Sequence, residues 1–298
     1  MKHNARVLCI LLLLFLTTQY VGLAIVNHYI DYEQSTTKVI ATPLPSIIGQ
    51  EIARPQVSES QSPLYIMAAV LIGTVLAFVF LRFAKPIFWK VWFFLAVSLC
   101  LYFAFATIIP ATIAGMLAIV CAALKTWKPS TIVHNVTEIF LYGGMVSVFF
   151  TIVNIPAAVI MLLLISAYDA YAVWKSKHMI VLAKAQAKAG MFAGLLIPYG
   201  KHTLKPVKKS ITPSKTVRVA VLGGGDLGFP LLFSAAVLKD FALSGMGWLA
   251  LLIPPFAALG LGLLLWYGKK DKFYPAMPFI SAGCFVGLGV VFLVRMLL

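Results

Sequence analysis

Long hydrophobic runs, separated by short charged or Pro- and Gly-containing segments, recur along the whole chain. Runs of about 18 or more apolar residues predict helices that cross a membrane, because about 20 residues span the hydrocarbon core. The pattern predicts an all-α polytopic membrane protein with nine transmembrane helices, at residues 7–26, 64–83, 88–108, 110–124, 137–153, 156–174, 217–238, 243–267 and 275–298. The fourth segment is short for a full crossing, but the distribution of charges requires it.

Composition agrees with this interpretation. Of the 298 residues, 61% are hydrophobic and only 11% are charged, and the mean hydropathy is +0.97, which is far above the range of soluble domains. The net charge of +15 does not indicate nucleic-acid binding, because the basic residues lie in short loops without accompanying aromatic residues. The four cysteines lie inside hydrophobic runs without metal-ligand spacing, so we expect no metal and no cofactor. His134, before the predicted fifth helix, is interpreted as a solvated loop residue, and the Asn135-Val136-Thr137 sequon as a chance occurrence.

The loop charges predict the orientation. Lys2 and Arg6 precede the first helix, acidic residues predominate in 27–63, and nine lysines without any acid occupy 175–216. Because positively charged loops stay in the cytosol, we expect a multi-pass protein of the cell membrane with a cytosolic N-terminus and an extracytosolic C-terminus. The first run also fits a cleaved signal peptide, although its length favours a retained helix. The predicted division is a six-helix part (1–174), a basic cytosolic loop (175–216) and a three-helix part (217–298).

Two aspartates, Asp169 and Asp226, lie inside predicted helices. A carboxylate in hydrocarbon is costly unless it is protonated, paired or hydrated, so each is a candidate functional residue. Asp169 lies six residues before Lys175 and Asp226 eight residues after Arg218, which places both about 9 to 12 Å inside the cytosolic face at ~1.5 Å per residue. Three glycines, Gly223 to Gly225, favour a departure from helical geometry just before Asp226.

Two carboxyl groups at one site share a proton and so provide both an acid and a base. Such a pair can hydrolyse a peptide bond with water alone, without a metal or a nucleophilic serine. A proton relay in a transporter or channel, or a purely structural pair, explains the same placement equally well.

Three motifs distinguish these interpretations. Tyr168-Asp169 followed by Ala172-Val173, Leu222-Gly223-Gly224-Gly225-Asp226, and Pro275-Ala276-Met277-Pro278 resemble, in order, the YD, GxGD and PAL motifs of the presenilin and signal peptide peptidase family. The chain looks most similar to the prokaryotic presenilin homologues. The resemblance implies an intramembrane aspartyl protease in which Asp169 and Asp226 are catalytic. It also implies a substrate cleft formed by Tyr168, Gly223, Gly225, Pro275, Ala276 and Met277.

The sequence departs from the family pattern at two positions. Met277 replaces the leucine of PAL, a swap that conserves volume, and Leu227 stands where presenilins usually carry an aromatic residue. The expected partners are transmembrane-helix substrates and the lipid bilayer, without nucleic acid or accessory subunits, and a homo-oligomer stays open. Because a substrate helix must be unwound before cleavage, we expect it to pair as a strand with residues 190–199 or with backbone near Gly223. The alternative function is a proton-coupled transporter or channel that uses the two aspartates as a relay.

Overall fold

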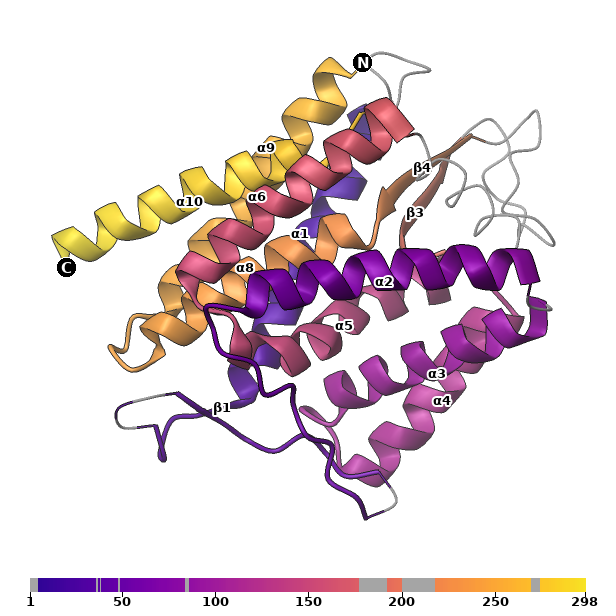
Figure 1. Cartoon of the computed structure of the whole chain (residues 1–298), viewed down its shortest axis with the longest axis horizontal. Coiled ribbons are helices and arrows are strands. Elements are labelled where there is room, and N and C mark those ends of the chain that lie inside the picture. Colours follow the sequence, from indigo (N-terminus) through magenta and orange to yellow (C-terminus); the bar gives the residue numbers. More distant parts are fainter. Residues whose placement is uncertain are drawn as a thin grey trace.

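The computed structural model describes residues 5–35, 37, 39–47, 49–83, 86–176, 192–199, 218–268 and 274–298. This part of the chain contains nine α-helices, as the sequence predicts (Figure 1). They are α1 (Ala5–His28), α2 (Ser62–Phe83), α3 (Pro86–Phe105), α4 (Ala111–Trp127), α5 (Thr131–Phe149), α6 (Ile155–Tyr171), α8 (Gly225–Ala242), α9 (Ile253–Tyr267) and α10 (Met277–Leu297). Short 3₁₀ turns, Phe150–Ile152 and Gly247–Leu252, follow α5 and precede α9.

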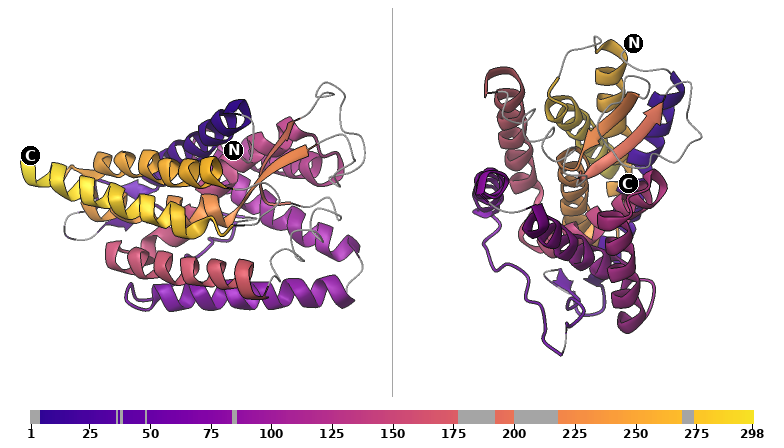
Figure 2. Two further views of the ribbon diagram at one scale, coloured as in Figure 1. Left: turned by 90° about the horizontal axis from the view of Figure 1, so that it is seen from above. Right: turned by 90° about the vertical axis from the view of Figure 1, so that its right-hand side faces the viewer.

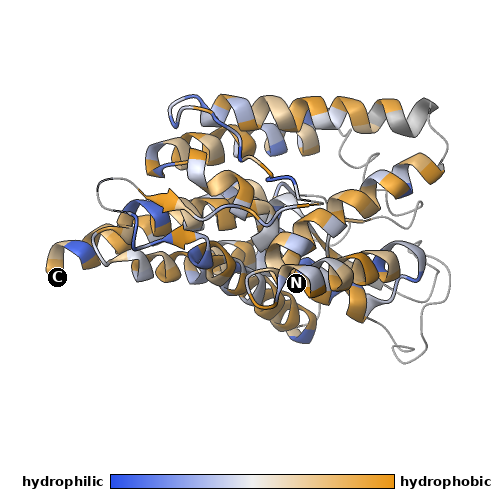
Figure 3. Cartoon of the chain, turned by 90° about the horizontal axis from the view of Figure 1, so that it is seen from below, coloured by the Kyte–Doolittle hydropathy of each residue, from blue (hydrophilic) through white to orange (hydrophobic). Residues whose placement is uncertain are grey.

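Most of these helices have the length and hydropathy of membrane spans. Six are long and apolar enough to cross a bilayer, and α2 and α4 contain shorter apolar stretches. Most of the helical ribbon in Figure 3 has the colour of hydrophobic residues. Large apolar side chains such as Leu13, Trp92 and Leu263 are exposed. An apolar exterior of this kind suits contact with lipid rather than with water.

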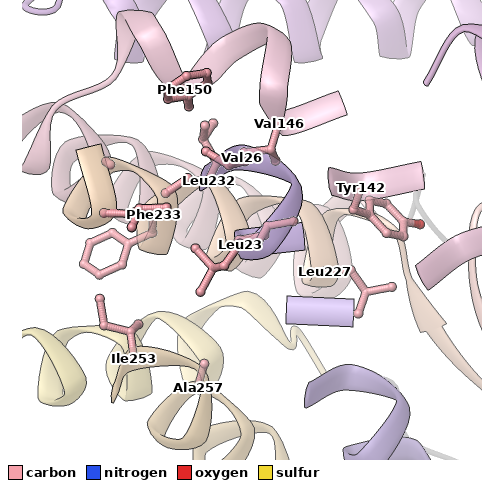
Figure 4. Packing of buried hydrophobic residues seen from close by; sticks show 14 of the residues in the cluster. Leu23, Val26, Tyr142, Val146, Phe150, Leu227, Leu232, Phe233, Ile253 and Ala257 are labelled. Atoms are coloured by element: carbon pink, nitrogen blue, oxygen red, sulfur yellow. The ribbon is translucent and has the colours of Figure 1, made fainter. Parts of the chain in front are cut away.

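The centre of the fold is α8, which contacts α1, α5, α6, α9 and α10. Nearly all of its side chains are buried, and Leu232 and Phe233 pack with Leu23 and Val26 of α1 (Figure 4). Around it, α9 and α10 form a closely packed pair. A Cβ atom on Gly260 or Gly283 would collide with a backbone carbonyl of the other helix, so glycine is required for this approach.

Two small antiparallel sheets add to the helical fold. In the connection from α1 to α2, β1 (Ile30–Asp31) pairs with β2 (Ile40–Ala41). At the opposite end of the bundle, β3 (Gly194–Tyr199) pairs with β4 (Arg218–Gly223) (Figure 1, Figure 2). In the register of this pair, Gly194 lies opposite Gly223. Residues 177–191 and 200–217, most of the basic loop, lie outside the described residues.

Three predicted helix starts were wrong. The predicted helix 243–267 begins with the 3₁₀ turn Gly247–Leu252 and is α-helical only from Ile253, because Gly245 adopts a positive φ of 71° and proline stands at the first positions of α9. The predicted helix 217–238 is a strand up to Gly223 and a helix only from Gly225, because a short apolar run rich in valine fits a strand as well as a helix. The predicted helix 137–153 begins earlier, at Thr131, because the Ser130 hydroxyl accepts a hydrogen bond from Val133 N (3.2 Å) and caps it. His134 therefore lies in a helix and is buried, and its interpretation as a solvated loop residue was wrong.

Candidate active site

Asp169 is held at the junction of α6 and α10. It lies in the last turns of α6, where its side chain is only 6% exposed. Its carboxylate Oδ2 accepts a hydrogen bond from the backbone N–H of Met277 (3.1 Å), and the backbone of Ala276 donates a second one. About one turn before Asp169, Ser166 Oγ donates to Ser281 Oγ of α10 (2.8 Å) and fixes the two helices together. The first turn of α10 thus orients the Asp169 carboxyl group.

Asp226 lies in the first turn of α8, three residues after the end of β4. It is partly exposed, and its carboxylate accepts a hydrogen bond from the backbone of Gly223. The charge of Asp169 acts on Asp226, so the two carboxyl groups share one electrostatic environment. The abrupt change from strand to helix at Gly224, which the glycine triplet favours, brings Asp226 to this place.

The remaining motif residues surround the two aspartates. Tyr168 precedes Asp169 in α6 and is partly buried, Pro275 is buried, and Ala276 occupies the cap position of α10. Met277 is 3% exposed and begins α10, two residues later than the sequence predicts. Gly223 and Gly225 flank Gly224 in the turn before Asp226. The structure therefore brings all three motifs to one end of the bundle.

Comparison with known proteins supports what this arrangement suggests. A family model described as signal-peptide peptidase, presenilin aspartyl protease matches residues 36–297. The chain belongs to this family. It is an intramembrane aspartic protease and a multi-pass membrane protein, and the transporter alternative finds no support.

Solved structures agree on the fold. One is a presenilin family intramembrane aspartate protease in space group C222, with a TM-score of 0.65 and 19% identity, over 96% of this chain and 99% of that chain. A second, of a presenilin family intramembrane aspartate protease in space group P2, has a TM-score of 0.59 and 18% identity, over 95% and 96% of the two chains. At this identity the likeness establishes the fold. No curated protein sequence matches.

A second buried polar group lies beside the protease motifs and was not predicted from the sequence. Lys125 follows the predicted fourth helix by one residue, but it belongs to α4, is 2% exposed and forms an ion pair with Glu138 of α5. Glu138 is fully buried and also accepts a hydrogen bond from the Tyr142 hydroxyl. Because Glu138 lies inside the predicted helix 137–153, the rule that drew attention to the two aspartates would also have identified it.

Gly224 is the other missed residue. A Cβ atom built there would lie 2.6 Å from the Tyr142 hydroxyl oxygen, whereas at Gly225 the nearest atom would be a Phe229 ring carbon at 3.5 Å. In this protease the steric demand of the turn is therefore greatest at the middle position of GxGD. The described residues contain no group of three or more His, Cys, Asp or Glu side chains that could hold a metal ion.

Proposed function

We propose that Asp169 and Asp226 are the catalytic pair with which this protease hydrolyses peptide bonds of transmembrane helices. The observation that carries the proposal is their convergence. The two acids come from helices far apart in the sequence, yet the charge of Asp169 acts on Asp226, and the backbone of the PAL-like motif bonds directly to Asp169.

The pair suits acid–base hydrolysis. With one proton shared between the carboxyl groups, the ionised member takes a proton from water as its oxygen attacks the scissile carbonyl carbon. The protonated member donates its proton to the carbonyl oxygen, which gives a tetrahedral gem-diol intermediate. Collapse of that intermediate breaks the C–N bond as a proton moves to the departing amine nitrogen, and the pair returns to its single-proton state.

The β3–β4 hairpin offers the substrate a place to unwind. The N–H and C=O groups of Gly194 and Leu196 point away from β4, toward α5. The alternation of an antiparallel ladder then directs the Val219 and Val221 backbone groups to the other side of the hairpin. Pro198, which has no N–H to donate, faces Val219 in the register, as this alternation requires.

The free edge of β4 ends three residues before Asp226. Val221 is 52% exposed, and among the described residues its N–H and C=O have no partner outside the strand. An unwound substrate that added as a strand along Val219 to Gly223 would have its peptide groups satisfied up to the turn before Asp226.

The charge pattern supports a cytosolic location of the site. Arg6 lies in the first turn of α1, Lys128 directly follows α4, and Lys175 lies four residues after α6. The start of α1 and the ends of α4 and α6 lie at the end of the bundle that carries the hairpin (Figure 1). Under the positive-inside rule this end faces the cytosol, so the N-terminus is cytosolic and the C-terminus extracytosolic. We further propose that the protease acts without accessory subunits, alone or as a homo-oligomer.

The test compares three Asp→Asn variants in purified protein. Asp169→Asn and Asp226→Asn should each lower cleavage of a transmembrane peptide at least about a hundredfold, because each removes one member of the pair. Asp240→Asn is the matched control, since it lies in the last turn of the same helix as Asp226 and its oxygen accepts a bond from Ile155 N (2.8 Å), which an amide oxygen can also accept.

A transition-state mimic of peptide hydrolysis adds a binding measurement. It should bind the wild type and Asp240→Asn but neither of the other variants. Cleavage that survives in either Asp169→Asn or Asp226→Asn, with the unfolding temperature unchanged, would rule out the proposed pair.

A further inference from the structure

A buried polar cluster outside the proposed catalytic pair connects α4, α5 and the hairpin. We call it the α5 clasp, and it consists of Lys125 of α4 and His134, Asn135, Glu138 and Tyr142 of α5. The α5 members recur at helical spacing, so they lie along one side of the helix. Burial of the charged Lys125 and Glu138 side chains costs free energy, and the proposed acid–base chemistry does not involve them. The clasp therefore calls for another explanation.

The clasp closes the outer edge of β3. His134 Nε2 lies 2.7 Å from Gly194 O, and because a carbonyl only accepts, this ring nitrogen carries the proton. The Gly194 N–H donates to Glu138 Oε2 (3.0 Å). Asn135 donates from Nδ2 to Leu196 O (2.8 Å) and accepts from Leu196 N at Oδ1 (3.0 Å). Four backbone groups that would otherwise need a neighbouring strand are thus satisfied by side chains of a helix.

The same cluster reaches the turn before Asp226. Glu138 accepts hydrogen bonds from the Lys125 ammonium, the Tyr142 hydroxyl and the Gly194 N–H. The Tyr142 hydroxyl lies directly against Gly224, where even a methyl group would not fit. Gly224 in turn donates its N–H to Ala193 O (3.1 Å), next to Gly194. In Figure 4, Tyr142 and Leu227, the residue after Asp226, lie at the same end of the core cluster.

Hydrogen bonds to the backbone can fix a register that apolar packing specifies only weakly. A slip of β3 by one residue would exchange its outward N–H and C=O groups with those that face β4. Because Leu195, Leu196 and Ile197 are all buried, burial of apolar side chains on β3 distinguishes poorly between the two registers. The amide of Asn135 and the carboxylate of Glu138 recognise particular backbone groups and so fix one register. Because β4 is paired to β3, that register also fixes the free edge of β4 and the Gly223–Gly225 turn.

We propose that the α5 clasp is a positioning device for cleavage, with Glu138 and Asn135 as its principal positioning residues. It sets the register of the hairpin before a substrate arrives, and through Tyr142 and Gly224 it sets the location of Asp226. This inference rests on the proposed function. It assigns to α4 and α5 a role in holding the site that the three family motifs do not contain.

The experiment compares two double variants, Lys125→Met with Glu138→Gln and Lys125→Met with Glu138→Leu. Both remove the ion pair, so neither leaves a buried charge without a partner. Only glutamine retains an oxygen that can accept from Gly194 N–H and the Tyr142 hydroxyl. We expect the glutamine variant to keep kcat/KM for a transmembrane peptide within about threefold of wild type, and the leucine variant to lose at least about tenfold at a similar unfolding temperature.

Two measurements distinguish positioning from general stability. Amide hydrogen exchange at Gly194 to Ile197 should become faster in the leucine variant but stay near wild type in the glutamine variant. Binding of the transition-state mimic should weaken by the same factor as kcat/KM, because both depend on the population of the correct hairpin.

Asn135→Ala provides a second test without any buried charge, and its neighbour Val136→Ala is the control because Val136 is 49% exposed on the outside of α5. Asn135→Ala should reproduce the faster exchange and the loss of cleavage, and Val136→Ala should show neither. Wild-type exchange and cleavage in Asn135→Ala would overturn the inference whether or not the double variants fold. If Asp169→Asn and Asp226→Asn are inactive in that case, the proposed catalytic pair still stands.

Discussion

The two outer edges of the β3–β4 hairpin differ in how their backbone groups are satisfied. On β3, the groups of Gly194 and Leu196 bond to side chains of α5, of which His134 and Glu138 are buried and Asn135 is partly buried. On β4, Val221 is half exposed, and the described part of the chain supplies no partner for its outward N–H and C=O. An unpaired edge invites another strand, and a protein that leaves one edge free while closing the other restricts where that strand can add. The closed edge thus gives the open edge a fixed position relative to Asp226.

The largest effect on stability should come from substitution of Glu138, the acidic residue of the α5 clasp. Glu138→Leu alone leaves the Lys125 ammonium buried without its partner, which we expect to destabilise the protease by about 3–5 kcal/mol. The measurement is the unfolding temperature in detergent. Adding Lys125→Met to this variant should recover most of the loss, since the unpaired charge disappears. A single variant as stable as the double variant would contradict the ion pair.

The next effect concerns Gly224, which joins β4 to α8. Gly224→Ala would place a methyl group 2.6 Å from the Tyr142 hydroxyl oxygen, and Glu138 holds that hydroxyl in place. Overpacking of this kind costs about 1–3 kcal/mol, so we expect a lower unfolding temperature and weaker cleavage. Gly225→Ala is the matched control for stability, because its methyl group would make only an ordinary contact with Phe229. Equal unfolding temperatures of the two variants would show that the turn tolerates a side chain at both positions.

The sequence predicts the helical part of this comparison but little of the hairpin. Hydropathy, together with the loop charges for the short fourth segment, predicts all nine helices of the described residues, and the exclusion of charge from lipid makes Asp169 and Asp226 conspicuous. The same hydropathy extends the seventh helix over β4, since a six-residue apolar strand adjoining a helix carries no separate signal. The role of Asn135 depends on contacts across about 60 residues of chain, which no local pattern encodes. An unwound substrate was expected to pair with residues 190–199 or with backbone near Gly223. Residues 194–199 and 218–223 are strands that pair with each other, and pairing with a substrate stays a prediction.

The smallest effect on stability, and the most specific one on cleavage, should come from the open edge. Val221→Pro removes one outward N–H, and because this group makes no bond to β3, the hairpin should keep its register and the protease its unfolding temperature. If the substrate adds as a strand along β4, the lost hydrogen bond should lower kcat/KM for a transmembrane peptide by about 3- to 10-fold, the equivalent of ~0.5–1.5 kcal/mol.

Val221→Ala retains the N–H while it also shortens the side chain, so the difference between the two variants isolates the backbone group. Amide exchange at Leu195 and Ile197, which lie on the paired side of β3, reports whether the hairpin itself has changed. Equal kcat/KM values in the proline and alanine variants, with exchange unchanged, would mean that the substrate does not use this N–H. The free edge of β4 would then result only from the pairing of β3 with the α5 clasp, and the unwound substrate would pair with other backbone near Gly223.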